Sequence, residues 1–470
     1  MKKKIQVFIN DWLRQLQTIS SWPLLRPGNF PEWLVIFTLI VALVLLYFVT
    51  ARPLDQTDIV AFRLWNLTAT MSKENTLTLD HTVITPMSTA LTNLSGLAYF
   101  QGHYYIDLAP GVALLSLPFY QVGSLWGMSG SATFGVYLMA LAGGGVVLSI
   151  YGTARALGVS FSSARFAALS VGLTSVLWRQ AGQFGPGVFT LLLLGLALWL
   201  VFFPISPDFS TKGESQTLHL SLWGSASLGF ILGFAGVVDY PNLSWTPVFL
   251  FYLVANRRLS VKSFSSFAAG WLIGLIPLLI YNWVIFNRPW AFTYGFDLSN
   301  PAGRSTIGQF FGDFRLENLG EAFFAPGRGQ FGPVILLFGL WGLFLLAKQP
   351  KWRPEFFLLG SLIALSLLFG LGRQLSGAWR VDFILAILPP LGLGVAFWHE
   401  RFIVTARPRP KVRWLIALTL SGIVLYYLLS EPGLWSGDPL YLLPPLLLSA
   451  VVGAGWLFIH FVIARITKTT

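Results

Sequence analysis

Side chains that could do chemistry stand close to the ends of long apolar segments of this 470-residue chain. Asp55 and Asp58 follow the apolar run 33–50, and Arg380 precedes the apolar run 383–399. A carboxylate in such a place can take up a proton as a general base. A guanidinium group there can bind a phosphate through two parallel hydrogen bonds, or it can reach the membrane interface as an ordinary anchor.

A second polar pair is His103 and Asp107, which lie four residues apart. This i, i+4 spacing fits a shared divalent metal ion, although one pair does not define a metal site. Asp107 also precedes Pro110 and Gly111, where an Asp often caps a turn or a helix start. A loop His such as His103 is often only solvated. The sequence thus identifies no certain cofactor, and a divalent metal stays an open alternative.

The composition excludes a water-soluble globular protein. Hydrophobic residues make up 55% of the chain and charged residues only 11%, against about 25% charged residues in typical soluble domains. A soluble surface could not cover so much apolar material, whereas a lipid bilayer accepts it. The chain has no Cys, which excludes disulfides and thiolate nucleophiles.

Apolar runs of sufficient length to span a bilayer recur along the chain. We expect spans at 33–50, 131–155, 164–178, 186–203, 222–238, 245–256, 265–286, 332–347, 355–371, 383–399, 414–430 and 442–464. When the sides are alternated from a cytoplasmic N-terminus, most of the 31 Lys and Arg residues fall on the inner side. The sequence therefore predicts an all-α polytopic protein of about twelve transmembrane helices in the inner (plasma) membrane, with both termini cytoplasmic.

The remaining segments complete this organisation. Residues 1–32 have the apolar spacing of an amphipathic helix on the inner leaflet, with a solvated lead-in as the alternative. Residues 33–470 then form a single transmembrane domain. Its two long outer segments are a first extracytoplasmic loop at 51–130 and a second one at 287–331. Loops of this length are usually functional.

The apolar run 111–126 inside the first loop is too short for a confident span, and Pro118 interrupts it. Counting it as a span would also move Arg155 and Arg165 to the outer side. We therefore expect an interfacial helix, or one that enters and leaves on the same side.

Five groups of residues resemble motifs of the GT-C superfamily of integral membrane glycosyltransferases, near the bacterial relatives of protein O-mannosyltransferases (glycosyltransferase family 39). The groups are Arg52–Asp58, Gly102–Gly111 with Leu117–Tyr120, Tyr281–Asn282 with Phe286–Pro289 and Tyr294, Arg328–Pro333, and Trp379–Arg380 with Pro389–Pro390. The chain departs from the usual Gly-Pro-Arg triplet at Ala378–Trp379–Arg380.

The resemblance implies transfer of a hexose, as by a mannosyltransferase, from a polyprenyl phosphate donor to an acceptor on the extracytoplasmic side with inversion. It implies Asp58 as the general base, with Asp55 as its rival. It implies donor-phosphate binding by Arg380, Arg328 and Arg304.

The same resemblance implies an acceptor or substrate pocket. Its residues are His103, Tyr105, Asp107, Tyr281 and Asn282. The implied partners are the sugar donor, membrane lipids and a lipid, glycan or protein acceptor. Nucleic acid is not among them, because the net charge of +12 follows from the basic inner loops.

A multi-span transporter or lipid flippase without transferase activity is the alternative, and a non-catalytic scaffold is a third. Twelve spans with both termini inside is also a transporter layout. Transporters usually show internal repeats and polar residues in the middle of spans. The sequence has no motif repeated between its halves, and its long outer loops favour an enzyme.

The substitution Asp58→Asn separates these hypotheses. If Asp58 is the general base, the variant loses sugar transfer by roughly 10²- to 10⁴-fold, since a general base contributes that much. Binding of the lipid donor, measured by its protection against thermal unfolding, stays unchanged. Transfer at the wild-type rate would remove Asp58 as the base.

Overall fold

The computed structural model describes residues 30–51, 59–80, 97–125, 133–203, 220–291, 333–371 and 385–406. Within these ranges the chain is helical apart from one two-stranded antiparallel sheet. The predicted all-α class is therefore confirmed at this level, with a β-hairpin that the sequence reading did not anticipate. The predicted spans 414–430 and 442–464 and nearly all of segment 1–32 lie outside the described residues.

Every predicted span within the described ranges coincides with a helix. The helices are α2 (Phe30–Val49), α6 (Thr133–Ala156), α7 (Phe161–Thr174), α9 (Gly187–Phe202), α10 (Leu222–Val238), α11 (Trp245–Ala255), α12 (Val261–Phe286), α15 (Pro333–Lys348), α16 (Arg353–Leu371) and α18 (Leu388–His399). Among them, Phe134–Ala156 and Val261–Phe286 are long and apolar enough to cross a membrane, as is the helical stretch Pro350–Phe369.

One predicted boundary was wrong. The span expected at 164–178 is broken, because α7 ends at Thr174 and the short helix α8 (Leu177–Ala181) follows. Ser175 has an extended backbone there, and its hydroxyl accepts the Leu177 N–H at 3.1 Å, which starts the new helix. Helix α18 begins at Leu388 after a turn at Ala386 and Ile387, and Pro389 and Pro390 occupy its first turn, a position that tolerates proline. The start expected at 383 lies outside the described residues.

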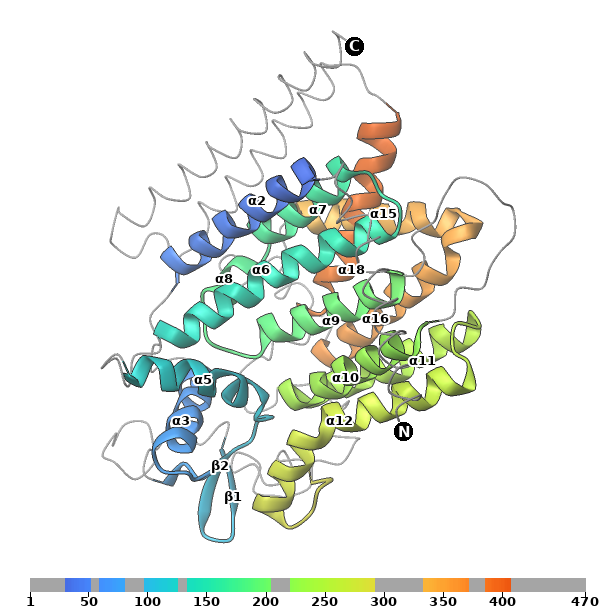
Figure 1. The fold of residues 1–470 in the computed structure, drawn as a ribbon. Coiled ribbons are helices and arrows are strands. Elements are labelled where there is room, and N and C mark those ends of the chain that lie inside the picture. Colours follow the sequence, from blue (N-terminus) through green and yellow to red (C-terminus); the bar gives the residue numbers. More distant parts are fainter. Residues whose placement is uncertain are drawn as a thin grey trace, which may run out of the picture.

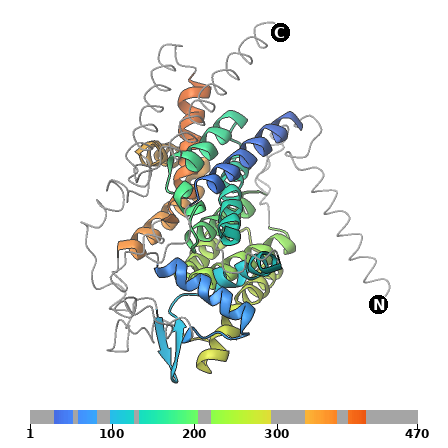
Figure 2. The same cartoon turned by 90° about the vertical axis from the view of Figure 1, so that its left-hand side faces the viewer.

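The sequence analysis assigned the ends of successive spans to alternate sides of the membrane. Helix ends assigned to the same side lie close together in the structure. At one end Trp178 donates to Thr50 Oγ1 at 2.7 Å, and Asn242 donates to Thr190 Oγ1 at 3.0 Å. The β-hairpin lies at this same end of the bundle, at the lower left in Figure 1 and at the bottom in Figure 2. We call it the hairpin end, and the opposite one the far end.

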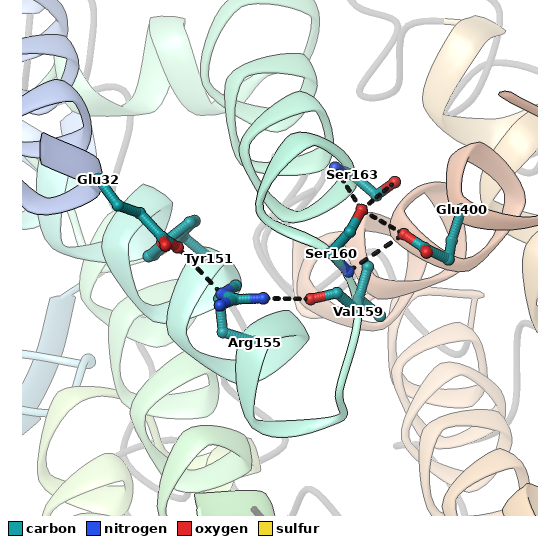
Figure 3. Close-up of polar contacts among 7 residues, drawn as sticks. All are labelled: Glu32, Tyr151, Arg155, Val159, Ser160, Ser163 and Glu400. Carbon is teal, nitrogen blue, oxygen red and sulfur yellow. Dashed lines mark hydrogen bonds and ion pairs between the residues drawn. The ribbon is translucent and has the colours of Figure 1, made fainter. Parts of the chain in front are cut away.

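The far end is tied together by charged side chains (Figure 3). Glu32 at the start of α2 accepts the Tyr151 hydroxyl at 2.5 Å and pairs with Arg155 at 3.1 Å. Glu400, the first residue of the π-helix η7 (Glu400–Thr405), accepts the backbone N–H of Ser160 at 3.1 Å. These contacts fix the far ends of α2, α6, α7 and α18 relative to one another.

Close helix packing depends on glycine in the pair α10 and α12. Gly229 and Gly233 on α10 face α12, and Gly270 and Gly274 on α12 face α10. A Cβ at any of the four would overlap a backbone carbonyl oxygen of the other helix; at Gly270 that oxygen belongs to Ala226. Both pairs have the small-xxx-small spacing that lets membrane helices approach closely.

The substitution Gly270→Ala is expected to destabilise the protein. The added methyl group has no space, and overpacking of this kind costs about 1–3 kcal/mol. The matched control is Gly360→Ala on α16, where an added Cβ meets no atom within 4 Å. We expect this control to keep or raise the thermal unfolding temperature in detergent, because Ala is a better helix former than Gly. Equal unfolding temperatures for the two variants would contradict the close approach.

Candidate active site

The hairpin end carries a small subdomain built from the first predicted loop. It consists of α3 (Ile59–Lys73), β1 (Leu97–Phe100), β2 (His103–Ile106) and α5 (Gly111–Leu125). Gln101 and Gly102 both have positive φ angles, of 52° and 92°, as the tight turn between two strands requires. The helix expected at 111–126 is α5, which lies at this end of the bundle together with α3 (Figures 1 and 2).

Helix α12 supports the hairpin. Its 26 residues extend about 39 Å at 1.5 Å per residue, longer than the hydrocarbon core of about 30 Å. The last turns of α12 pack against the sheet, since Tyr281 and Phe286 share one buried cluster with Tyr105. The rings of Phe286 and Phe100 are 5.3 Å apart. The hairpin is therefore held by a helix that is long enough to project from the membrane.

Asp107 lies in the turn that joins β2 to α5, and only 3% of it is exposed. The close approach of Gly111 to α10 fixes this turn, because a Cβ at Gly111 would lie 2.5 Å from the carbonyl oxygen of Val237. Ala109 in the same turn packs against Tyr240, which follows α10. A carboxylate is thus carried to the end of α10 and buried there.

A buried polar cluster forms where these elements meet. Its members are Tyr105, Asp107, Tyr240 and Tyr281, and we include Asn282 because it follows Tyr281 on α12; each is at most 8% exposed. Tyr105, Asp107 and Tyr240 are all close enough to Tyr281 to act electrostatically on its hydroxyl group. The cluster combines residues from β2, the following turn, the segment after α10 and the last turns of α12.

Two atoms of this polar cluster have no hydrogen-bond partner among the described residues. They are the hydroxyl oxygen of Tyr281 and Oδ1 of Asn282. The Asn282 amide nitrogen, in contrast, donates to the carbonyl oxygen of Pro289 at 3.2 Å. Buried polar atoms normally have a partner, so this site suits a ligand that offers hydroxyl groups.

His103 lies at the exposed edge of the subdomain, and the backbone does not favour the metal-binding pair with Asp107 that the sequence left open. His103 begins a strand, in which four residues extend about 13 Å, whereas i, i+4 neighbours meet only in a helix. Its Nδ1 instead lies 2.6 Å from Oδ2 of Asp80. Among the residues that the structure describes, no three His, Asp or Glu side chains gather as a metal site would need.

Tyr105 links this edge to the buried cluster. Its ring and that of His103 are 6.4 Å apart, and its ring lies 6.1 Å from that of Phe286. Burial raises the pKa of the Tyr105 hydroxyl, and the negative charge of Asp80 raises it further. Tyr105 is therefore a neutral hydrogen-bonding group at physiological pH.

The structure brings together Tyr105, Asp107 and Tyr281, and Asn282 follows Tyr281 on α12; that these residues form a substrate pocket stays a prediction. It places His103 at the rim. The remaining predicted site residues, Asp55, Asp58, Arg304, Arg328 and Arg380, lie outside the described residues. Tyr240 and Asp80 were missed as site residues, because only the packing of distant segments reveals their neighbours.

The substitution Tyr281→Phe is expected to leave the unliganded protein at least as stable as the wild type. The hydroxyl finds no partner among the described residues, so its removal relieves a desolvation cost of about 1–3 kcal/mol rather than a hydrogen bond. The control is Tyr47→Phe, whose hydroxyl donates to the carbonyl oxygen of Gly172 at 2.8 Å in the core. Thermal unfolding should show a loss of about 1 kcal/mol for the control alone. A clear loss for Tyr281→Phe would assign its hydroxyl a structural role.

Comparison with known proteins gives a fold relation. No family model matches the chain, and no curated protein matches its sequence. The crystal structure of ArnT from Cupriavidus metallidurans bound to undecaprenyl phosphate is similar, with a TM-score of 0.52 and 14% identity over 86% of this chain. The chain covers 66% of that structure. The oligosaccharyltransferase of Archaeoglobus fulgidus in its apo form is matched at a TM-score of 0.49, with 13% identity over 86% of this chain and 56% of that one.

The likeness to ArnT extends over most of the described helices, although few residues are identical. At this level of identity the likeness supports a shared helix architecture and says nothing about the substrate. It shows that the chain has a fold like that of ArnT; the GT-C superfamily of integral membrane glycosyltransferases is the one that the sequence motifs resemble.

Proposed function

We propose that this protein is a membrane glycosyltransferase that transfers a hexosyl group from a polyprenyl-phosphate donor to an acceptor on the extracytoplasmic side. The observation that carries the proposal is the polar cluster, buried at the hairpin end of a bundle with a fold like that of ArnT. A solvent-excluded group of hydroxyls, an amide and a carboxylate at a helix-bundle mouth is a typical substrate site.

The chemistry of the polar cluster fits a sugar or another hydroxyl-rich acceptor. The Asn282 Oδ1 accepts hydrogen bonds, and the Tyr281 hydroxyl can both donate and accept. Sugar hydroxyls do the same, so a bound sugar would supply the partners that the described residues do not provide. Asp107 adds a carboxylate that binds a pair of neighbouring hydroxyls.

Asp58 is our proposed general base, with Asp55 as its alternative. Helix α3 begins at Ile59, the residue after Asp58, and α3 contacts both α5 and β2. Asp58 therefore directly precedes a helix that belongs to the hairpin subdomain. In the proposed step the base takes the acceptor proton, the acceptor oxygen bonds to the anomeric carbon, and polyprenyl phosphate leaves with the electrons of the broken C–O bond. Inversion follows when base and leaving group lie on opposite faces of the sugar.

The leaving phosphate needs positive charge, for which we propose Arg380, with Arg328 and Arg304 as further ligands. The planar fork of an arginine matches two phosphate oxygens. A divalent ion is the alternative source of this charge, with Asp107 as an oxygen ligand.

The charges of the far end support an extracytoplasmic site. Exposed basic residues at that end include Arg257 just after α11, Lys348 at the end of α15 and Lys351 just before α16, whereas the polar cluster lies at the opposite end. Cytoplasmic segments are enriched in Lys and Arg. We infer that the hairpin end faces away from the cytoplasm in the plasma membrane.

The test is sugar transfer by the purified protein in nanodiscs. Tritiated hexosyl-phosphoundecaprenols that differ in the sugar are supplied with extracted cell-envelope lipids and glycans as acceptors. We expect transfer from at least one donor, reduced roughly 10²-fold or more by Arg380→Ala, because the developing phosphate charge loses its preorganised partner. Arg257→Ala, an exposed change at the far end, is the control and should transfer normally.

Movement of the intact donor between leaflets without any transfer would contradict the enzyme and support a flippase instead. Equal transfer by Arg380→Ala and Arg257→Ala would remove Arg380 as the phosphate ligand.

A further inference from the structure

Asp80 bridges the polypeptide before the hairpin and strand β2 through both of its carboxylate oxygens. Oδ1 accepts the backbone N–H of Tyr104 at 2.8 Å. Oδ2 lies 2.6 Å from Nδ1 of His103. The neighbouring backbone of Leu79 donates to the carbonyl oxygen of Tyr104 at 2.7 Å, so the Asp80 side chain is held in place from several directions.

This arrangement fixes the tautomer of His103. A carboxylate only accepts hydrogen bonds, so the contact requires the proton to be on Nδ1. In the neutral ring Nε2 then carries the lone pair and accepts hydrogen bonds. The His103 side chain is 54% exposed, which leaves the ring accessible to a molecule from the aqueous side.

His103 stands next to the polar cluster. It lies on the same face of β2 as Tyr105, two residues further on, and the two rings are 6.4 Å apart. Tyr105 in turn packs into one cluster with Tyr281. His103 is therefore an exposed polar side chain that neighbours a member of the buried cluster.

We propose that Asp80 is a positioning residue, which holds His103 so that Nε2 accepts a hydrogen bond from a hydroxyl group of the acceptor substrate. The inference rests on the proposed function and refines it, since it assigns a hydroxyl-bearing acceptor to the hairpin side of the site. Asp80 acts through His103 and does not itself touch the acceptor.

The variant Asp80→Asn tests this role without removing the side chain. The Tyr104 N–H needs an acceptor, so the amide oxygen of Asn must take the place of Oδ1. The amide nitrogen then points to Nδ1 of His103 and donates to it. Nδ1 then accepts the hydrogen bond, and the ring proton moves to Nε2. Nε2 becomes a donor and can no longer accept a hydrogen bond from a hydroxyl group of the acceptor substrate.

The tautomer can be read directly. The chain has five His residues, so ¹⁵N-histidine labelling gives few signals, and His103→Gln identifies the one from His103. At pH 8 we expect the protonated nitrogen to be Nδ1 in the wild type and Nε2 in Asp80→Asn. An unchanged tautomer in Asp80→Asn would overturn the positioning role.

Kinetics in the nanodisc assay give the second measurement. Asp80→Asn and His103→Gln should each raise the KM for the acceptor about 10- to 100-fold, the effect of a lost or reversed hydrogen bond, while donor binding stays unchanged. The control is Tyr104→Phe, because its side chain points to the opposite face of β2 and its backbone N–H remains. This control should transfer with the wild-type acceptor KM.

The outcomes separate the inference from the proposed function. An active enzyme in which Asp80→Asn inverts the tautomer but keeps the acceptor KM overturns the inference and leaves the transferase intact. A wild-type protein that transfers no sugar removes both, and the ¹⁵N spectrum then shows whether Asp80 still fixes the tautomer as a structural contact only. If Asp80→Asn and Asp80→Ala lower the unfolding temperature equally, Asp80 has only a structural role in holding the hairpin, and the inference is overturned.

Discussion

The structure depends on one constraint: the hydrocarbon core of a membrane offers no water to polar groups, so they gather at the ends of the helices. At the far end Glu32, Arg155 and Glu400 each find a protein partner and hold several helices together. At the hairpin end the polar residues are more deeply buried, and Tyr281 and Asn282 keep atoms without a partner among the described residues. Oε2 of Glu355, on α16, also has no partner there, so the grouping of several buried polar side chains, and not the unpartnered atoms alone, supports the hairpin end as the proposed place for a ligand.

The helices follow from the sequence because their cause is local. Each needs only a sufficiently long apolar run, and α10 has the bounds that hydropathy predicts. The breaks at Ser175 and at Pro389 are also local, but they arise from a side-chain hydrogen bond and from proline in a first turn. Hydropathy averages over such details, which explains why the helices were found and the break at Ser175 was missed.

The hairpin escaped prediction for a different reason. Its strands have four residues each, too few for a clear alternation, and its turn is Gln101–Gly102 rather than a typical Asn-Gly pair. Read as a helix, His103 and Asp107 suggest a metal site; as a strand, they separate, and His103 meets Asp80 instead. Tyr105 and Asp107 were nevertheless predicted as pocket residues, because the motif that contains them can be recognised whatever its local structure. Tyr240 was not, since only the packing of α10 against the turn after β2 brings it to the site.

The geometry of the polar cluster depends in turn on glycines far from it. Gly233 and Gly274 bring α10 and α12 into backbone contact in the middle of the bundle. The same pair of helices continues into the cluster of Val237, Tyr240, Leu275 and Leu278 at the hairpin end. Because helices are rigid, the separation of Tyr240 and Tyr281 is set by this contact rather than by the residues around the hydroxyl groups. A methyl group added between the two helices should therefore shift the cluster as well as cost stability, and the loss of ligand binding need not scale with the loss of folding free energy.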